Sequence, residues 1–243
     1  MPASGDAGAG AVIEACGDQA FMVRFGMRID RGLNARALAL AARVREAAPG
    51  WLLDCVPSYA AVLVTFDALA VEPDAVEEFI RAKMTPTDAA PNAGSPAARL
   101  VEVPVCYAPE MAPDLGDVAT ACGLSADDVV RRHAAAVYRV YTLGFRPGFP
   151  FLGTVDQAIA VPRLGTPRAR VPAGAVGIAG HQTGIYPSAG PGGWRLIGRT
   201  PWRLFDPTAA AAHRFRLAAG DEVRFVPIAA SDFRLLIEEP DVD

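Results

Sequence analysis

The sequence predicts two domains: a small α+β domain with helices on one face of a small sheet, followed by a mainly-β barrel domain. Three observations support this. Helix and strand patterns alternate over residues 1–86, residues 87–98 carry Pro, Gly, Ala, Asn and Ser without periodicity, and residues 99–243 contain many short β-prone pieces separated by Gly and Pro. A chain of 243 residues is long enough for both domains.

The first domain is predicted to follow the order β-α-β-β-α. A strand covers residues 20–26, and Asp30 caps a helix whose apolar residues recur at three- and four-residue spacing until Pro49 and Gly50. Two extended segments follow within residues 51–67, and a second helix begins at Pro73. This order is typical of a sheet covered by helices on one face.

The second domain is predicted to begin with a strand at 99–107 and two helices. The second of these helices has Ser125 and Asp128 in a capping-box arrangement. From Tyr138 onward the pattern indicates a β-barrel or a sandwich. The β-prone pieces are 138–145, 158–162, 177–180, 194–198, 222–228 and 233–239.

The composition excludes several classes of function. A net charge of −4 gives no general reason to bind nucleic acid or an anionic membrane, and no apolar run is long enough to span a bilayer. The N-terminus lacks the pattern of a secretory signal, so a cytoplasmic protein is expected. The four cysteines lack metal-site spacing, which predicts small buried side chains and no metal site.

Residues 144–207 have an unusual composition. They hold 12 of the 23 glycines, 9 of the 21 prolines, and seven arginines against two aspartates. This local positive charge predicts an anionic partner, with the alternative that the arginines only solvate loops. The whole chain lacks a phosphate loop, a dinucleotide turn and a nucleophile elbow, and its three histidines and one lysine leave little acid/base machinery.

The candidate site residues lie in this glycine- and proline-rich region. His133 shares a helix face with apolar residues and is interpreted as a core histidine, and His213 as structural, whereas His181 lies between glycines that allow close approach of a ligand. Phe149 and Trp194 are predicted to form an apolar wall. The alternative is a proline-braced loop that closes the barrel end.

The same stretches carry a family resemblance that covers nearly the whole chain. "LGFRPGFPFLG", "TPRARVPAGAVGIAGHQTGIYP", "PGGWRLIGRTPWRLFDP" and "GDEVRFVPI" occur in that order, after "GDQAFMVRFG", "VPSYAAVLVTFD" and "VEVPVCY". The chain resembles the family of KipI and the 5-oxoprolinase B subunit, also called allophanate hydrolase subunit 1. It departs from the family pattern at His181, where glycine is expected.

The resemblance implies a cyclophilin-like barrel and an enzyme complex. In such a complex this chain joins a homologous C subunit and an A subunit. Together they open 5-oxoproline to L-glutamate with hydrolysis of ATP. The ATP site is expected to be shared with the partner subunits or supplied by them. The chain alone is expected to be inactive. A lactam is a poor electrophile, and ATP-driven phosphorylation of its carbonyl oxygen makes the ring carbon open to attack, so the step needs anion clamps and oriented donors.

The side-chain chemistry of these stretches suggests roles for individual residues in such a complex. Gln182, Thr183 and Tyr186 are the predicted catalytic group. The predicted substrate-binding residues are Arg146, Phe149, His181, Trp194 and Arg199. Two alternatives remain from other relatives: inhibition of a sensor histidine kinase through a protein–protein surface, and one half of a biotin-dependent carboxyltransferase.

Overall fold

A computed structural model describes residues 11–84 and 98–238 of the chain. The chain divides into two compact units, Met1–Ala97 and Ala98–Asp243. This division falls inside the predicted boundary between the two domains. The predicted linker, 87–98, lies outside the described residues except for residue 98.

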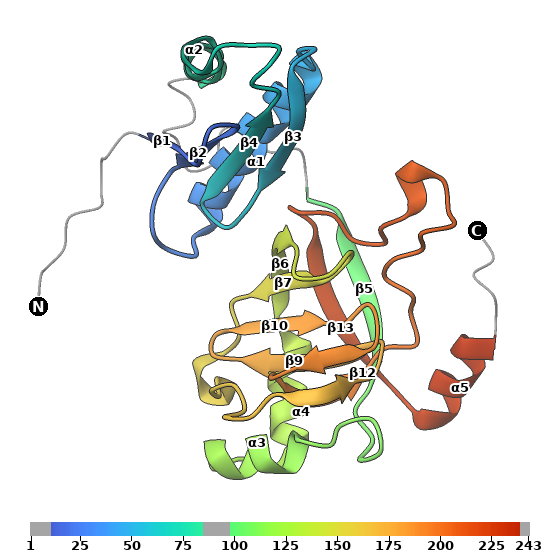
Figure 1. The fold of residues 1–243 in the computed structure, drawn as a ribbon. Helices are drawn as coiled ribbons and strands as arrows, with labels where there is room; N and C mark the ends of the chain where they lie inside the picture. The colour runs from blue at the N-terminus through green and yellow to red at the C-terminus, as the bar shows by residue number, and fades with distance from the viewer. Residues whose placement is uncertain (1–10, 85–97, 239–243) are drawn as a thin grey trace, which may run out of the picture. The chain divides into compact units, whose positions relative to one another are not determined.

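The first unit is an antiparallel sheet with two helices (Figure 1). Its strand order is β1-β2-β4-β3, so the prediction missed one strand, β1. That strand is four residues long, lies at the sheet edge and is largely exposed, which leaves little hydrophobic alternation to detect. The elements are β1 Val12–Ala15, β2 Ala20–Arg24, α1 Arg31–Ala47, β3 Leu52–Pro57, β4 Ala61–Phe66 and α2 Pro73–Lys83.

Both helices cover the same face of this sheet, as predicted. Val23 of β2 and Val64 of β4 are fully buried in one core with Leu40 of α1 and Ile80 of α2. Alternate strand residues point to opposite faces, so these contacts place both helices on one side. The Asp30 side chain accepts a hydrogen bond from the Leu33 N–H, which confirms the predicted cap.

The second unit contains a closed seven-stranded barrel, which confirms the barrel and removes the sandwich alternative. Strands β10-β7-β6-β13-β5-β12-β9 follow one another around it, and β13 runs parallel to β5. A separate two-stranded sheet pairs β8 (Arg168–Val171) with β11 (Gly190–Gly192). The barrel strands are β5 Leu100–Cys106, β6 Val137–Leu143, β7 Pro150–Gly153, β9 Ala175–Ala179, β10 Gln182–Ile185, β12 Arg195–Arg199 and β13 Glu222–Ile228.

Helices α3 (Leu115–Cys122) and α4 (Ala126–Ala135) lie together at one end of the barrel (Figure 1). The predicted capping box of α4 is present: the Ser125 side chain accepts from the Asp128 N–H, and the Asp128 side chain accepts from the Ser125 N–H. Two short 3₁₀ helices also occur, η2 (Gln157–Ile159) and η3 (Ala211–His213).

Two of the predicted β-prone pieces are not strands. Residues 233–238 of the piece 233–239 lie in the helix α5 (Ala230–Glu238), and residue 239 lies outside the described residues. Phe233, Leu236 and Ile237 recur at three- and four-residue spacing, a helical period that is hard to recognise in so short a window. Residues 158–162 form part of η2 and a single bridge between Val161 and Gly180. Both errors concern short apolar runs, in which helix and strand patterns overlap.

The cysteine prediction holds for two of four side chains. Cys55 and Cys106 are buried, Cys122 is partly buried and Cys16 is exposed, and all four are free thiols. Burial raises the pKa of the Cys55 thiol to about 11. In the part of the chain that the structure describes, no helix is long and apolar enough to cross a bilayer.

Candidate binding site in the barrel unit

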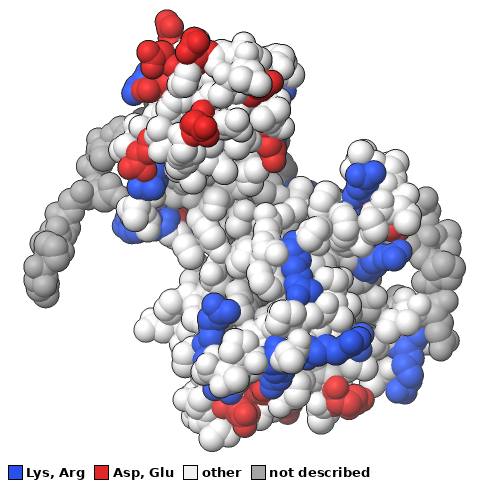
Figure 2. Space-filling view, in the orientation of Figure 1, with Lys and Arg blue, Asp and Glu red and all other residues white. Residues whose placement is uncertain are grey.

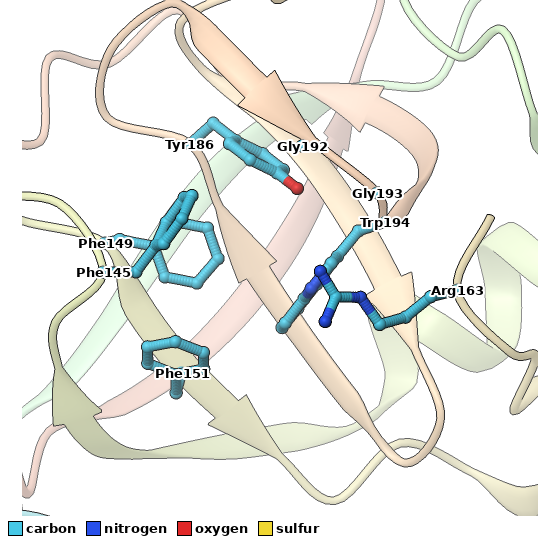
Figure 3. A pocket seen from close by; sticks show the side chains of 8 residues that line it. All are labelled: Phe145, Phe149, Phe151, Arg163, Tyr186, Gly192, Gly193 and Trp194. Carbon is cyan, nitrogen blue, oxygen red and sulfur yellow. The ribbon is translucent and has the colours of Figure 1, made fainter. Parts of the chain in front are cut away.

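A pocket of about 130 Å³ opens in the barrel unit. We call it the aromatic pocket, and it is lined by Phe145, Phe149, Phe151, Arg163, Tyr186, Gly192, Gly193 and Trp194. Figure 3 shows the three phenylalanines on one side and Arg163 beside Trp194 on the other. The pocket therefore combines one cation, Arg163, and one phenol hydroxyl, that of Tyr186, with aromatic walls.

Edge-to-face contacts hold the wall of the aromatic pocket. The ring of Phe149, the residue before β7, lies 5.2 Å from Tyr186 and 5.4 Å from Trp194 between ring centres, at angles of 81° and 89°. Such T-shaped contacts are favourable beyond the apolar area that they bury. Because Phe149, Tyr186 and Trp194 are all buried, the wall is a fixed part of the fold.

Two glycines give these rings their space. A Cβ at Gly192 would lie 2.5 Å from the Tyr186 hydroxyl oxygen, and a Cβ at Gly184 would lie 2.9 Å from the Phe149 ring. Real Cβ atoms essentially never approach so closely. The glycines of the sequence therefore serve the close packing of this wall.

The Tyr186 hydroxyl lies in a positive environment. Burial raises the pKa of Tyr186, while a hydrogen bond from the backbone N–H of Trp194 and the charges of Arg163, Arg146 and Arg168 act in the opposite direction with smaller effect. The phenol therefore stays protonated at neutral pH. Its O–H group is a hydrogen-bond donor at the edge of the aromatic pocket.

Three other arginines of residues 144–207 are engaged by the fold. Arg168 forms a two-pronged ion pair with Asp114, with N–O distances of 2.9 and 2.5 Å. Arg146 donates to the Ala189 carbonyl at 2.8 Å and lines a neighbouring open groove of about 370 Å³. Arg199 donates to the Ala173 carbonyl at 2.8 Å.

Arg163 differs from these arginines. It lines the aromatic pocket, and with respect to residues 11–84 and 98–238 it makes neither a hydrogen bond nor an ion pair. Its position is fixed through its neighbour Leu164, whose N–H donates to the Gly193 carbonyl at 2.8 Å. The Arg163 guanidinium is therefore a charged group without a fixed protein partner.

The predicted site residues separate into two groups. Phe149, Tyr186 and Trp194 line the aromatic pocket. The lining does not include the other predicted residues, which are Arg146, His181, Gln182, Thr183 and Arg199. The prediction did not single out Arg163 among the seven arginines of the region. Its place at the pocket depends on the backbone hydrogen bond from Leu164 to Gly193, which the sequence does not reveal.

Thr183 lies in the barrel interior with His133, which is a fully buried core histidine as predicted. The Thr183 hydroxyl donates to the Gly177 carbonyl at 3.0 Å, so it accepts from His133 Nε2 at 2.9 Å, and His133 Nδ1 accepts from the Tyr107 hydroxyl at 2.8 Å. Burial lowers the pKa of His133 to about 3. The neutral imidazole thus joins α4 to β10.

The other two histidines lie at the surface. His181 is exposed in the turn between β9 and β10, and its carbonyl accepts from the Val155 N–H at 2.9 Å. His213 is exposed at the end of η3. Basic side chains gather on the face of the barrel unit that Figure 2 shows, so positive charge extends beyond the aromatic pocket.

Residues 11–215 match the sequence profile of the family "Carboxyltransferase domain, subdomain C and D". The match covers well over half of the chain, and the chain belongs to this family. Within it, the chain is 41% identical to the 5-oxoprolinase B subunit of Bacillus subtilis (strain 168) over 237 residues, which are 93% of this chain and 97% of that protein. It is 52% identical to the 5-oxoprolinase B subunit of Escherichia coli O157:H7 over 132 residues, 54% of this chain and 60% of that protein. The resemblance seen in the sequence is confirmed.

Solved structures share the fold. TTHA0988 superposes with a TM-score of 0.76 at 39% identity over 87% of this chain and 40% of its own, so this chain spans less than half of that protein. Urea carboxylase of Kluyveromyces lactis superposes with a TM-score of 0.73 over 98% of this chain and 23% of its own. At 20% identity, this second likeness shows the fold alone.

Proposed function

We propose that the chain is the B subunit of an ATP-dependent 5-oxoprolinase, which opens 5-oxoproline to L-glutamate together with an A and a C subunit in the cytoplasm. The observation that carries the proposal is the similarity to the B subunit of the Bacillus subtilis enzyme, which extends over 93% of this chain and 97% of that protein. Similarity at that extent leaves no large part of either protein unmatched.

The size of the aromatic pocket supports a substrate of this kind. An apolar cavity of about 150 Å³ holds a benzene molecule. The aromatic pocket, at about 130 Å³, therefore suits a five-membered ring such as that of 5-oxoproline. Phe149 and Trp194 supply apolar walls, and the Tyr186 hydroxyl supplies a donor for a carbonyl or carboxylate oxygen.

The remaining predicted residues contact the substrate only if it extends beyond the aromatic pocket. Arg146 lines the adjoining groove, and Gln182 and His181 lie at and beside the start of β10. Thr183 acts, in this proposal, through the buried bonds that hold β10, and Arg199 through its bond to the Ala173 carbonyl. These are positioning roles.

ATP does not fit the aromatic pocket. Pockets for drug-sized ligands measure roughly 300–1,000 Å³, whereas this pocket measures about 130 Å³. The sequence also lacks the glycine-rich loop that commonly cradles phosphates. We therefore assign ATP to a site that the partner subunits supply or share.

Reconstitution tests the proposal. The chain is co-expressed with a C-type and an A-type subunit, and hydrolysis of ATP is measured with and without 5-oxoproline. We expect hydrolysis only with all three subunits and substrate, and none from the lone chain. ATP hydrolysis at the same rate with and without 5-oxoproline, or turnover of 5-oxoproline by the lone chain, would refute the proposed role.

The same material tests the two alternatives. A sensor-kinase inhibitor would lower autophosphorylation of a co-purifying histidine kinase, with no need for the other subunits. A carboxyltransferase half would transfer a carboxyl group from carboxybiotin in the presence of its partner domain. Either activity, together with no 5-oxoproline-dependent ATP hydrolysis, would replace the proposal.

A further inference from the structure

The arginines around the Tyr186 hydroxyl differ in whether their guanidinium groups have protein partners. The charge of Arg168 is neutralised by Asp114, whose side chain is only 4% exposed and also accepts from the Leu196 N–H at 2.6 Å. The guanidinium of Arg146 is held by the Ala189 carbonyl. Arg163 alone of the three lacks a hydrogen-bond or ion-pair partner among the residues that the structure describes.

No acidic side chain lines the aromatic pocket, so nothing in its lining balances the Arg163 charge. A guanidinium offers up to five N–H donors in a plane, and it binds a carboxylate through two parallel hydrogen bonds. The aromatic side chains beside the exposed guanidinium lower the local dielectric on the pocket side, and the attraction between charges rises as the local dielectric falls. The surroundings therefore favour an anion over a neutral or cationic ligand.

The geometry also limits the rest of the ligand. The Arg163 guanidinium lies near Gly193, with one terminal nitrogen 3.6 Å from the position that a Cβ on Gly193 would take, which is ordinary van der Waals contact. The Tyr186 hydroxyl lies at the Gly192 side of the same space (Figure 3). A compact ligand can thus meet a cation and a neutral donor at once.

We propose that Arg163 binds the carboxylate of a small ring-shaped acid whose ring lies against Phe149 and Trp194. The identity of that acid as 5-oxoproline rests on the proposed function. The carboxylate contact itself rests on the unpartnered guanidinium and the aromatic lining. Arg163 is thus the group that selects for an acid at this pocket.

Binding measurements test the carboxylate contact without turnover. Calorimetric titration of the full chain, and of the assembled complex without ATP, compares 5-oxoproline with 2-pyrrolidinone, the same lactam without the carboxylate. We expect the wild type to bind 5-oxoproline about 10- to 100-fold more tightly than 2-pyrrolidinone, the range for a charge-assisted contact.

Variants assign that preference to Arg163. Arg163→Ala should weaken the binding of 5-oxoproline by about 10- to 100-fold and leave the binding of 2-pyrrolidinone unchanged. The affinity of Arg163→Lys for 5-oxoproline should lie between those of Arg163→Ala and the wild type. Arg170→Ala is the matched control, because it removes the same charge from an exposed position of β8 outside the pocket lining. Arg163 is also exposed, so both changes should leave the melting temperature unchanged.

The outcomes separate this inference from the proposed function. Binding that Arg163→Ala abolishes, in a complex that never hydrolyses ATP with 5-oxoproline, supports the carboxylate contact and refutes the proposed reaction. An active complex whose KM for 5-oxoproline is unchanged by Arg163→Ala supports the reaction and overturns the contact. Equal binding of both lactams, or no saturable binding of 5-oxoproline in either preparation, also overturns it.

Discussion

Gly192 and Tyr186 pack so closely that a single methyl group between them has a measurable cost. In Gly192→Ala the new Cβ would lie 2.5 Å from the Tyr186 hydroxyl oxygen, so the ring has to move into the aromatic pocket. We expect a loss of about 1–3 kcal/mol in the free energy of unfolding, as for other overpacked sites, together with weaker 5-oxoproline binding. Urea denaturation and calorimetry measure the two effects.

Gly165→Ala is the control for this substitution, because a Cβ there meets no atom within 4 Å. It should change the free energy of unfolding by less than about 0.5 kcal/mol. If the two variants were equally stable and bound 5-oxoproline equally well, the close packing at Tyr186 would have no role in the pocket.

His133 gives the fold a dependence on pH. Burial lowers its pKa from the ordinary value of 6.5 to about 3, so the unfolded chain takes up this proton more readily than the folded one. The contribution of neutral His133 to the free energy of unfolding is therefore present above pH 6.5 and is lost as the pH falls toward 3. Between pH 7 and pH 5 the loss is about 2 kcal/mol.

The measurement is urea denaturation of wild type and His133→Gln at pH 7 and pH 5. Carboxylates common to both proteins cancel in the comparison, so the difference in slope belongs to His133. The variant should be less stable at pH 7 but should lose about 2 kcal/mol less on acidification. Parallel pH profiles would mean that the fold does not lower the pKa of His133.

At the residue level, sequence patterns identified the aromatic part of the pocket but not its cation. Phe149 and Trp194 stand beside glycines and prolines, a local pattern that indicates a rigid aromatic wall. Arg163 is one of seven arginines between residues 144 and 207, and adjacent residues do not set it apart. Among the described residues its lack of a partner is seen only in the fold, where Arg168 and Arg146 find Asp114 and the Ala189 carbonyl 54 and 43 residues away in the sequence.

Among the elements, α4 depends on its N-terminal cap. The Ser125 and Asp128 side chains satisfy backbone N–H groups at its start, and the helix carries His133 into the barrel core. Ser125→Ala should therefore lower the free energy of unfolding by about 1 kcal/mol, whereas Ser125→Thr should keep most of the cap. Urea denaturation at pH 7 compares the variants, and equal stability of the Ala variant and wild type would contradict the role of the cap.

Elements with local signals were predicted well, and those without them were not. The helix α1 has a cap and a long apolar period, and it was found where Asp30 predicted it. The strand β1 is held by pairing with β2, from Val12 opposite Arg24 to Ala15 opposite Phe21, and this pairing leaves no trace in its own four residues. Short elements that depend on a partner strand are beyond local pattern analysis.

On the scale of the whole molecule, the aromatic pocket joins segments that the chain order separates. Phe145 precedes β7, Arg163 follows η2, and Trp194 lies between β11 and β12, so closure of the barrel brings them together. The sequence indicated that these stretches share a site because their composition is alike. It did not show which side chains face the pocket, because that depends on the register of β7, β9 and β10.

The last prediction follows from the division of the chain into two units. The pocket and both of its walls lie within Ala98–Asp243, which has its own core. A fragment of residues 98–243 should therefore unfold in a single cooperative transition, as expected for an independent domain. It should bind 5-oxoproline as the full chain does, within about threefold, and Arg163→Ala should weaken binding equally in both. Circular dichroism melting and calorimetry make the comparison.

A fragment that folds but does not bind 5-oxoproline would mean that the first unit contributes to the site. A fragment that does not fold would show that the barrel needs the first unit for its stability.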